Sequence, residues 1–371
     1  MSERTVTVFV TVYNIEKHLE RFFTCLAAQT YPDFEALIVD DGSSDSSLAV
    51  CQRYAASDSR IRVIHTEHIG ISAARNLAFE NIRTPFATSL DGDDYFEADY
   101  LKHLMDAQEK NDADMVLSNV ILVNEDGSEK NRFCPREAGF YTEEDFPKLL
   151  PALLSEERLN YLYAKLYKTE LLREVRVEDN VMQGSDTMIN FKYLKNVRSI
   201  AIIEDYDYYY VQYKKRSVTS YMGKDYFMRL YRINKFLLDI TEEYGWQNEE
   251  MLDVIDCRIL HIGKNAIDRI LRSPDSAANQ YIRASEVVNS EAYLASYRRR
   301  KERDNGESFR TRYHYDMIAP GEEKAFIDRT AKAIKEKEQN ERLGRLREKC
   351  PDAVFKIWHK IRVLTGTARK Q

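Results

Sequence analysis

Several signals that usually define where a protein works are missing from this sequence of 371 residues. It has no run of about 18 consecutive apolar residues, so we expect no membrane-spanning helix. Its first residues lead straight into a β-rich segment, without the apolar region of a secretory signal. The five cysteines are odd in number and lack CxxC spacing, which favours reduced thiols over disulfides or a zinc site. Together these absences predict a cytoplasmic protein.

Two glycine-rich nucleotide loops are also missing. The sequence contains neither the GxGxxG loop that binds dinucleotides nor the GxxxxGK[ST] loop that surrounds phosphates. The first absence argues against a dehydrogenase. Any nucleotide must then be held by side chains and a metal ion instead of a glycine loop.

Negative charge dominates the chain but not its last part. The formal net charge is −6, yet residues 329–371 contain 13 Lys/Arg and 5 Asp/Glu, a charge of +8 against −14 for the rest. Apolar residues recur at helical spacing in this tail, at Val354, Phe355, Ile357, Trp358, Ile361 and Leu364. This pattern predicts peripheral contact with the inner face of the cell membrane. The alternative is a helix that packs on the protein body or on another subunit of a homo-oligomer.

Strands and helices alternate in the first hundred residues. Apolar, β-branched runs predict strands at 5–12, 34–39, 61–64 and 85–90. Helical periodicity predicts helices at 16–29, 46–56 and 70–78. This alternation indicates βαβ units and a Rossmann-like, doubly wound, mainly parallel sheet. Polar clusters follow the strand ends, so we expect them at one edge of the sheet.

The pattern is weaker after residue 105. We predict one strand at 114–123, a hairpin turn at 124–127 and another strand at 200–203. Helices are expected at 143–154 and 161–174, and the periodicity is helical from 225 onward.

Three carboxylates stand within four residues at the end of the predicted fourth strand. Asp91, Asp93 and Asp94 repel one another unless a cation or a set of donors compensates their charge. A divalent ion held by one or two carboxylates and substrate phosphates is a common solution. The alternative is an acidic turn, with Asp94 as the N-cap of a helix that starts near Phe96.

Together, six short motifs resemble family 2 inverting glycosyltransferases, which have the GT-A fold. The motifs, in the family's order and spacing, are VFVTVYN (8–14), IVDDGSSD (38–45), GISAARN (70–76), LDGDD (90–94), KLY (165–167) and GSD (184–186). The resemblance continues through 208–219 and implies a GT-A catalytic domain at 1–220, an α-helical domain at 221–328 and the basic tail at 329–371. The Gln-x-x-Arg-Trp signature of processive, membrane-spanning synthases is missing.

The resemblance also implies roles for individual residues. The expected nucleotide-binding residues are Thr11, Tyr13, Asp40, Asp41, Arg75 and Asp91. Among these, Asp40 and Asp41 would bind uracil, Tyr13 would stack on the base, and Asp91 would hold the ribose. Arg75 would contact the nucleotide or its phosphates; its alternative is a surface ion pair. For the aspartate pair, the alternative is a helix N-cap at Asp41 or Ser43.

Two further residues complete the chemistry that the resemblance implies. Asp93 would hold Mg²⁺ or Mn²⁺ against the diphosphate. Asp186 would act as the base that deprotonates an acceptor hydroxyl, unless it only caps a helix that begins at Thr187.

The resemblance therefore implies an inverting, metal-dependent hexosyltransferase. The donor would be a nucleotide-diphosphate sugar, most often a UDP-sugar. The acceptor would be a glycan or a lipid-linked molecule in the synthesis of bacterial surface polysaccharides, and no nucleic acid is expected. The alternatives are a non-catalytic nucleotide-sugar-binding scaffold subunit and a nucleotidyltransferase, although the latter would need a basic, glycine-rich loop after the first strand.

Overall fold

The structure is a computed structural model that describes residues 5–132, 138–179, 181, 184–213 and 226–303, with short pieces between 324 and 336. The apolar stripe at 354–364 lies outside these residues, and its contact with membrane or protein stays a prediction. The chain forms two compact units, and the boundary between them falls between Arg258 and Ile259. This boundary lies inside one helix, Glu249–Leu271. The domain limits near 220 and 328 stay predictions.

The larger sheet has eight strands in the spatial order β3-β2-β1-β4-β10-β6-β11-β9. The strands are β1 (Val6–Val12), β2 (Phe34–Asp41), β3 (Ile61–Thr66), β4 (Phe86–Ser89), β6 (Met115–Leu117), β9 (Gly139–Thr142), β10 (Lys165–Lys168) and β11 (Ser199–Ile202). Strands β3, β2, β1 and β4 are parallel, as are β6 and β11, whereas β10 and β9 run antiparallel to their neighbours. The prediction of a mainly parallel, doubly wound sheet is confirmed.

A smaller sheet has the order β5-β12-β7-β8. Its strands are β5 (Tyr95–Phe96), β7 (Val120–Asn124), β8 (Glu129–Arg132) and β12 (Tyr208–Gln212). The single strand predicted at 114–123 is wrong, because β6 and β7 belong to different sheets. Asn119 separates them, and its side-chain amide donates hydrogen bonds to the carbonyls of Ile203 and Glu204 in the β11–β12 connection. The β6–β7 and β11–β12 connections therefore run next to each other as they pass from the larger sheet to the smaller one.

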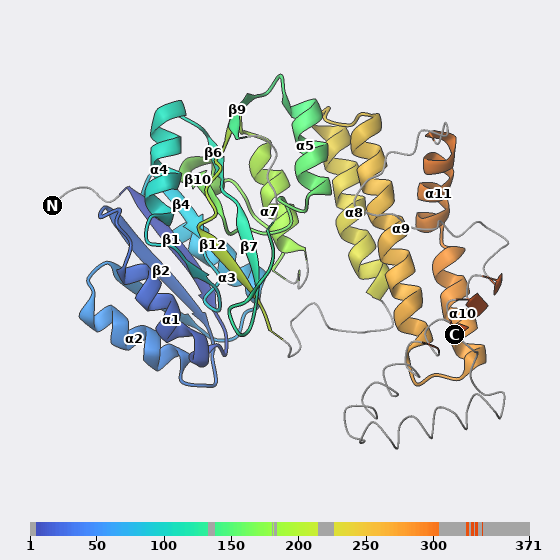
Figure 1. Cartoon of the computed structure of the whole chain (residues 1–371), viewed down its shortest axis with the longest axis horizontal. Helices are drawn as coiled ribbons and strands as arrows, with labels where there is room; N and C mark the ends of the chain where they lie inside the picture. Colours follow the sequence, from blue (N-terminus) through green and yellow to red (C-terminus); the bar gives the residue numbers. More distant parts are fainter. Residues whose placement is uncertain are drawn as a thin grey trace, which may run out of the picture. The chain divides into compact units, whose positions relative to one another are not determined.

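Helices cover both faces of the larger sheet (Figure 1). In all, the described part of the chain forms the helices α1 (Glu16–Ala27), α2 (Ser47–Ser57), α3 (Ile71–Asn81), α4 (Tyr100–Asn111), α5 (Phe146–Ser155), α6 (Thr169–Leu172), α7 (Ser185–Leu194), α8 (Tyr226–Glu243), α9 (Glu249–Leu271), α10 (Ala277–Val288) and α11 (Glu291–Arg303). The valines of β1 share a core with apolar residues of α1 and α4. On the other face, Phe9 packs edge to face against Phe79 of α3. The buried β1 strand thus has a core on both faces, as its nearly continuous apolar sequence predicts.

The expected α-helical region after the catalytic fold is confirmed by α8 to α11, as far as the structure describes it. The helix predicted at 161–174 is wrong. Instead, β10 is inserted between β4 and β6, and only the four residues of α6 are helical. Strand pairing in the sheet overrides the local helical periodicity here.

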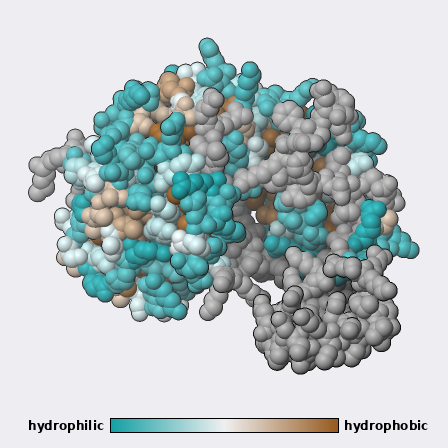
Figure 2. All heavy atoms as spheres, in the orientation of Figure 1, coloured by the Kyte–Doolittle hydropathy of each residue, from teal (hydrophilic) through white to brown (hydrophobic). Residues whose placement is uncertain are grey.

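No helix in the described part of the chain is both long and apolar enough to cross a bilayer. The described surface drawn in Figure 2 is mostly hydrophilic, with small hydrophobic areas between hydrophilic residues.

Candidate functional site

The carboxyl ends of β1, β2 and β4 meet at one edge of the sheet, as predicted. The three strands are parallel neighbours, so Tyr13, Asp40 and Asp91 emerge on the same side. The loops after β1 and β2 bind each other: the Asn14 side chain accepts hydrogen bonds from the backbone N–H groups of Ser44 and Asp45. These contacts give the edge a defined shape without a glycine loop.

Asp40 and Asp41 have different surroundings. Asp40 is fully buried, and its Oδ2 lies 2.8 Å from Nδ1 of His65, but its Oδ1 has no hydrogen-bond partner among the described residues. The Asp41 carboxylate accepts hydrogen bonds from the backbone N–H groups of Ile69 and Gly70. Asp41 therefore holds the loop before α3, whereas Asp40 has a buried oxygen that can still accept a hydrogen bond. The N-cap alternative for this pair is wrong, because α2 begins only at Ser47.

Tyr13 and Thr11 lie at the end of β1. Tyr13 is 45% exposed and stacks on the His68 ring, with ring centroids 4.2 Å apart. Thr11 is partly exposed and in register with Val39 of β2. Tyr13 follows Val12, which is in register with Asp40, and an exposed aromatic ring at this edge suits stacking on a flat nucleobase.

Asp94 has a structural part in the acidic turn after β4. Its carboxylate is almost fully buried and accepts hydrogen bonds from the Tyr208 hydroxyl (2.7 Å) and the Val211 backbone N–H (2.8 Å). The Tyr208 hydroxyl also accepts a hydrogen bond from the Asp91 backbone N–H at 3.2 Å. The N-cap alternative for Asp94 is wrong, because α4 begins at Tyr100 and Asp94 fastens the turn to β12 instead.

The contribution of the Tyr208 hydroxyl to the turn can be measured. We expect Tyr208→Phe to lower the free energy of unfolding by about 1–3 kcal/mol, because a buried carboxylate and an N–H group each lose a partner. Tyr209→Phe is a matched control: it removes an exposed hydrogen bond to Glu97, and we expect a change within about 0.5 kcal/mol. Urea unfolding of both variants checks this. Equal losses would show that the hydroxyl does not hold the turn.

Asp91 and Asp93 form the polar centre of the turn. Burial and the neighbouring carboxylates of Asp93 and Asp186 raise the pKa of Asp91 to about 7, although Arg75 opposes the shift. Burial also raises the pKa of Asp93, and the nearby His18 and Arg21 side chains partly offset this increase. The backbone carbonyl of Asp93, and not its carboxylate, accepts hydrogen bonds from Arg21 (2.5 Å) and Tyr213 (2.7 Å). The Asp93 carboxylate thus stays available for a cation, and the uncompensated charge of the turn fits a divalent ion.

The raised pKa of Asp91 predicts a pH dependence of stability. An unfolded aspartate titrates near 3.9 and Asp91 near 7, so between these values the folded protein binds more protons. Stability from this group is present at low pH and is lost as pH rises to about 7, by up to about 1.4 kcal/mol per pH unit. Urea unfolding in EDTA from pH 4 to pH 8 should give a shallower decline for Asp91→Asn than for the wild type. Parallel curves would contradict the shift.

Arg75 and Asp186 form an ion pair close to the acidic turn. The two terminal nitrogens of Arg75 donate to the two carboxylate oxygens of Asp186, at 2.5 and 3.2 Å, and one also donates to the Ser185 hydroxyl. The Arg75 side chain is 7% exposed and that of Asp186 is 23% exposed. The surface-pair alternative for Arg75 is therefore wrong. The cap alternative for Asp186 is also wrong, because α7 begins at Ser185 and its N-cap residue is Gly184.

Gly184 sets where α7 begins and so where Asp186 lies. Its φ of 79° is in the left-handed region that favours glycine. A Cβ at this position would lie 2.2 Å from Cδ1 of Ile233 in α8. Helix α8 therefore packs directly against the residue that precedes Ser185 and Asp186.

Sequence reasoning missed several residues of this region. Arg21 of α1 and Tyr213, which follows β12, donate hydrogen bonds to the Asp93 carbonyl. The Tyr208 hydroxyl of β12 accepts a hydrogen bond from the Asp91 backbone N–H. Arg21 lies in no motif, and Tyr208 and Tyr213 fall in the stretch 208–219, where the resemblance assigned them no role; their contacts join residues more than 70 positions apart. The histidines show no metal-ligand spacing in the sequence, but the structure brings His103 within ligand distance of Asp205 and Asp207.

The chain is similar to known glycosyltransferases. The chain is 31% identical over 194 residues to the glycosyltransferase GlyA of Streptococcus pneumoniae, covering 50% of this chain and 27% of GlyA. It is 25% identical over 250 residues to the poly(ribitol-phosphate) beta-N-acetylglucosaminyltransferase TarS of Staphylococcus aureus, covering 64% of this chain and 42% of TarS. The aligned part thus spans less than half of either relative.

A solved structure gives the same fold. The crystal structure of S. aureus TarS residues 1–349 in complex with UDP-GlcNAc superposes with a TM-score of 0.56 at 18% identity, covering 85% of this chain and 95% of the other. The profile of "Glycosyl transferase family 2" matches residues 7–198, just over half of the sequence. The chain belongs to glycosyl transferase family 2.

Proposed function

We propose that this protein transfers a sugar from a UDP-linked donor to a hydroxyl of a glycan or lipid-linked acceptor, with inversion at the anomeric carbon, in polysaccharide synthesis. The observation that carries the proposal is the meeting of three groups near one sheet edge: the Asp91–Asp93 turn, the Arg75–Asp186 pair and the exposed Tyr13 ring. The relative TarS, named a poly(ribitol-phosphate) beta-N-acetylglucosaminyltransferase, supports transfer to a polymer, and GlyA supports glycosyl transfer in general.

Recognition of uracil is assigned to Asp40 and Tyr13. The Asp40 Oδ1 atom is buried and has no donor among the residues that the structure describes, and leaving such an atom unpaired costs about 1–3 kcal/mol. The imide N–H of uracil would supply the missing donor while Tyr13 covers the ring. Asp41 keeps the neighbouring loop in place through its bonds to Ile69 and Gly70. The UDP-GlcNAc bound in the TarS crystal supports this choice of nucleotide.

Asp93, with Asp91 beside it, would hold Mg²⁺ or Mn²⁺. The metal ion, when bound, neutralises the negative charge of the departing diphosphate. Arg21 and Tyr213 position the carboxylate for this purpose, because both fix the backbone of Asp93. Asp91 would also orient the ribose.

Asp186 would accept the proton of the acceptor hydroxyl as the new bond forms. Arg75 holds both oxygens of Asp186 and so acts as a positioning residue for the base, in addition to the nucleotide contact predicted from the sequence. One displacement with a single base inverts the anomeric centre, so an α-linked donor gives a β-glycoside. Peripheral membrane contact through the tail at 329–371 would bring the enzyme to a lipid-linked acceptor.

A UDP-release screen tests the proposal. Purified protein is incubated with a panel of UDP- and GDP-sugars, with and without Mn²⁺, together with glycan or lipid-linked acceptors extracted from bacterial membranes. We expect one UDP-sugar to be consumed only with metal and acceptor present, and NMR of the product to show inversion. Binding of UDP-sugars without consumption of any would favour the scaffold subunit instead.

A further inference from the structure

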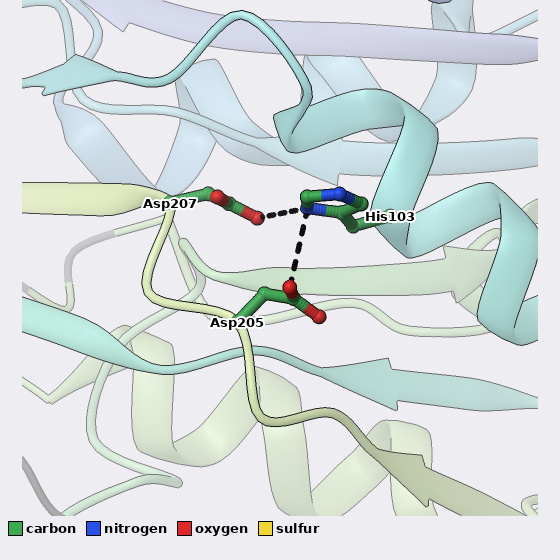
Figure 3. Close-up of side chains that lie close together, drawn as sticks. All are labelled: His103, Asp205 and Asp207. Carbon is green, nitrogen blue, oxygen red and sulfur yellow. Dashed lines mark hydrogen bonds and ion pairs between the residues drawn. The ribbon is translucent and has the colours of Figure 1, made fainter.

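We infer that His103, Asp205 and Asp207 form a second divalent-metal site, best suited to Zn²⁺ and separate from the acidic turn after β4. The three side chains come from α4 and from the connection between β11 and β12. Each offers one ligand atom, and the three atoms lie within 4.8 Å of one another. Figure 3 shows the imidazole turned toward both carboxylates, with Nδ1 facing them.

The distances fit a zinc ion after small adjustments. Nδ1 of His103 lies 2.8 Å from Oδ2 of Asp207 and 3.5 Å from Oδ1 of Asp205. Two ligands at about 2.1 Å from a tetrahedral zinc are about 3.4 Å apart, so these atoms already stand close to the edges of one coordination tetrahedron. One imidazole nitrogen and two carboxylate oxygens suit Zn²⁺, whereas Mg²⁺ prefers oxygen ligands alone.

Hydrogen bonds hold the ligand-bearing backbone in place. The carbonyl of Asp205 accepts from the Asn119 backbone N–H at 3.0 Å, and the carbonyl of Asp207 accepts from the Glu97 backbone N–H at 2.8 Å. His103 lies on the first turn of α4. All three ligands are therefore on fixed parts of the fold, which lowers the cost of assembling a metal site.

Charge and exposure also fit a bound cation. Asp99 adds a third carboxylate near His103, and Glu97 stands near Asp207, so negative charge exceeds what one imidazole offsets. The side chains of His103 and Asp205 are 32% and 43% exposed, whereas that of Asp207 is 10% exposed. Three protein ligands with one open, solvent-facing side leave room for a water molecule as the fourth ligand.

The site would brace β12. Asp207 directly precedes Tyr208, whose hydroxyl holds the Asp94 carboxylate. A metal ion that joins His103 of α4 to Asp207 would fix the start of β12, the strand that supports the acidic turn. The inference does not depend on the sugar-transfer reaction, because it rests on residues that do not line the proposed donor site.

Metal content measures the site directly. Full-length protein carrying Asp93→Asn, which removes the metal ligand proposed for the turn, is freed of metal and dialysed against micromolar Zn²⁺ before elemental analysis. We expect about one zinc ion per chain. Co²⁺ in place of Zn²⁺ should give the visible absorption of a tetrahedral site. An absence of bound zinc would overturn the inference.

Three added substitutions separate ligation from charge. His103→Gln and Asp205→Asn should each weaken zinc binding by at least about 10- to 100-fold, the loss seen when even an outer partner of a metal ligand is removed. Asp99→Asn is the matched control, since it removes a nearby charge but no ligand, and it should keep zinc affinity within about threefold of the parent. Equal weakening by Asp99→Asn and Asp205→Asn, or unchanged binding in His103→Gln, would reduce the cluster to a histidine–aspartate ion pair. Circular dichroism of the metal-free variants confirms that each is folded.

Discussion

Replacing Asp93 by asparagine is expected to lower the rate of sugar transfer by about 10³-fold or more while the protein stays folded. A metal ion at a diphosphate leaving group contributes several kcal/mol of charge stabilisation, and each 1.36 kcal/mol corresponds to a factor of ten in rate. The fold should tolerate the change because Arg21 and Tyr213 bind the backbone carbonyl of residue 93, which asparagine retains. Turnover with the UDP-sugar from the screen, measured across Mn²⁺ concentrations, checks the expectation.

The control for Asp93→Asn is Asp106→Asn. Asp106 lies on the exposed face of α4 and pairs with Lys102, so its loss removes one carboxylate without touching the turn. We expect wild-type activity and a stability change within about 0.5 kcal/mol. A wild-type rate in Asp93→Asn, or a wild-type enzyme indifferent to EDTA, would remove the metal from the mechanism.

Asp186→Asn is expected to lower turnover by about 10²–10⁴-fold, the usual contribution of a positioned base. Donor affinity should change little, because the acceptor side of the reaction loses its base while the Asp40, Tyr13 and Asp93 contacts remain. Asparagine is close in shape to aspartate, but its amide group cannot accept the second hydrogen bond from Arg75. Turnover and UDP-sugar affinity measured on the same preparation distinguish a chemical defect from a binding defect.

Ser185→Ala separates the base from its surroundings. It removes a hydroxyl that accepts a hydrogen bond from Arg75 and donates one to Oδ1 of Asp186 at 3.2 Å, but it leaves both oxygens of Asp186 paired with the guanidinium. We expect it to reduce turnover by less than about tenfold, the effect of about 1 kcal/mol. If Ser185→Ala matches Asp186→Asn, or if donor affinity is lost together with the helical signal, Asp186 is a structural residue.

Much of the fold and part of the site could be predicted from the sequence. Strands β1 and β2 each carry a mostly apolar run, and this hydrophobic pattern is a local signal that survives in the structure. Because parallel strands bring their carboxyl ends together, the shared edge of Tyr13, Asp40 and Asp91 could be expected from topology alone. The motif order then suggested the family that the comparisons show.

The features that could not be predicted depend on contacts between distant residues. Strand β10 looked helical because its apolar spacing fits a helix, but pairing with β4 and β6 decides its conformation. Asp94 resembled a helix cap because only its near neighbours were visible, whereas its partners Tyr208 and Val211 are more than 110 residues away. The Arg75–Asp186 pair spans 111 positions and could not be inferred from either motif alone. Local sequence patterns thus identify which carboxylates are present, and contacts between distant residues determine which carboxylate oxygens already have hydrogen-bond partners.

The close fit of Gly184 against Ile233 has a practical consequence for how far a working fragment of this protein must extend. The family profile ends at residue 198, yet the side chain that packs against the entry to α7 belongs to α8, which runs to Glu243. Helix α8 is in turn tied to α9, because Arg258 of α9 donates a hydrogen bond to the side chain of Asn234. A fragment cut at the profile limit would expose the apolar surface around Gly184 to water and leave the start of α7 without its packing partner. The smallest autonomous enzyme in this chain therefore includes helices that carry no family motif.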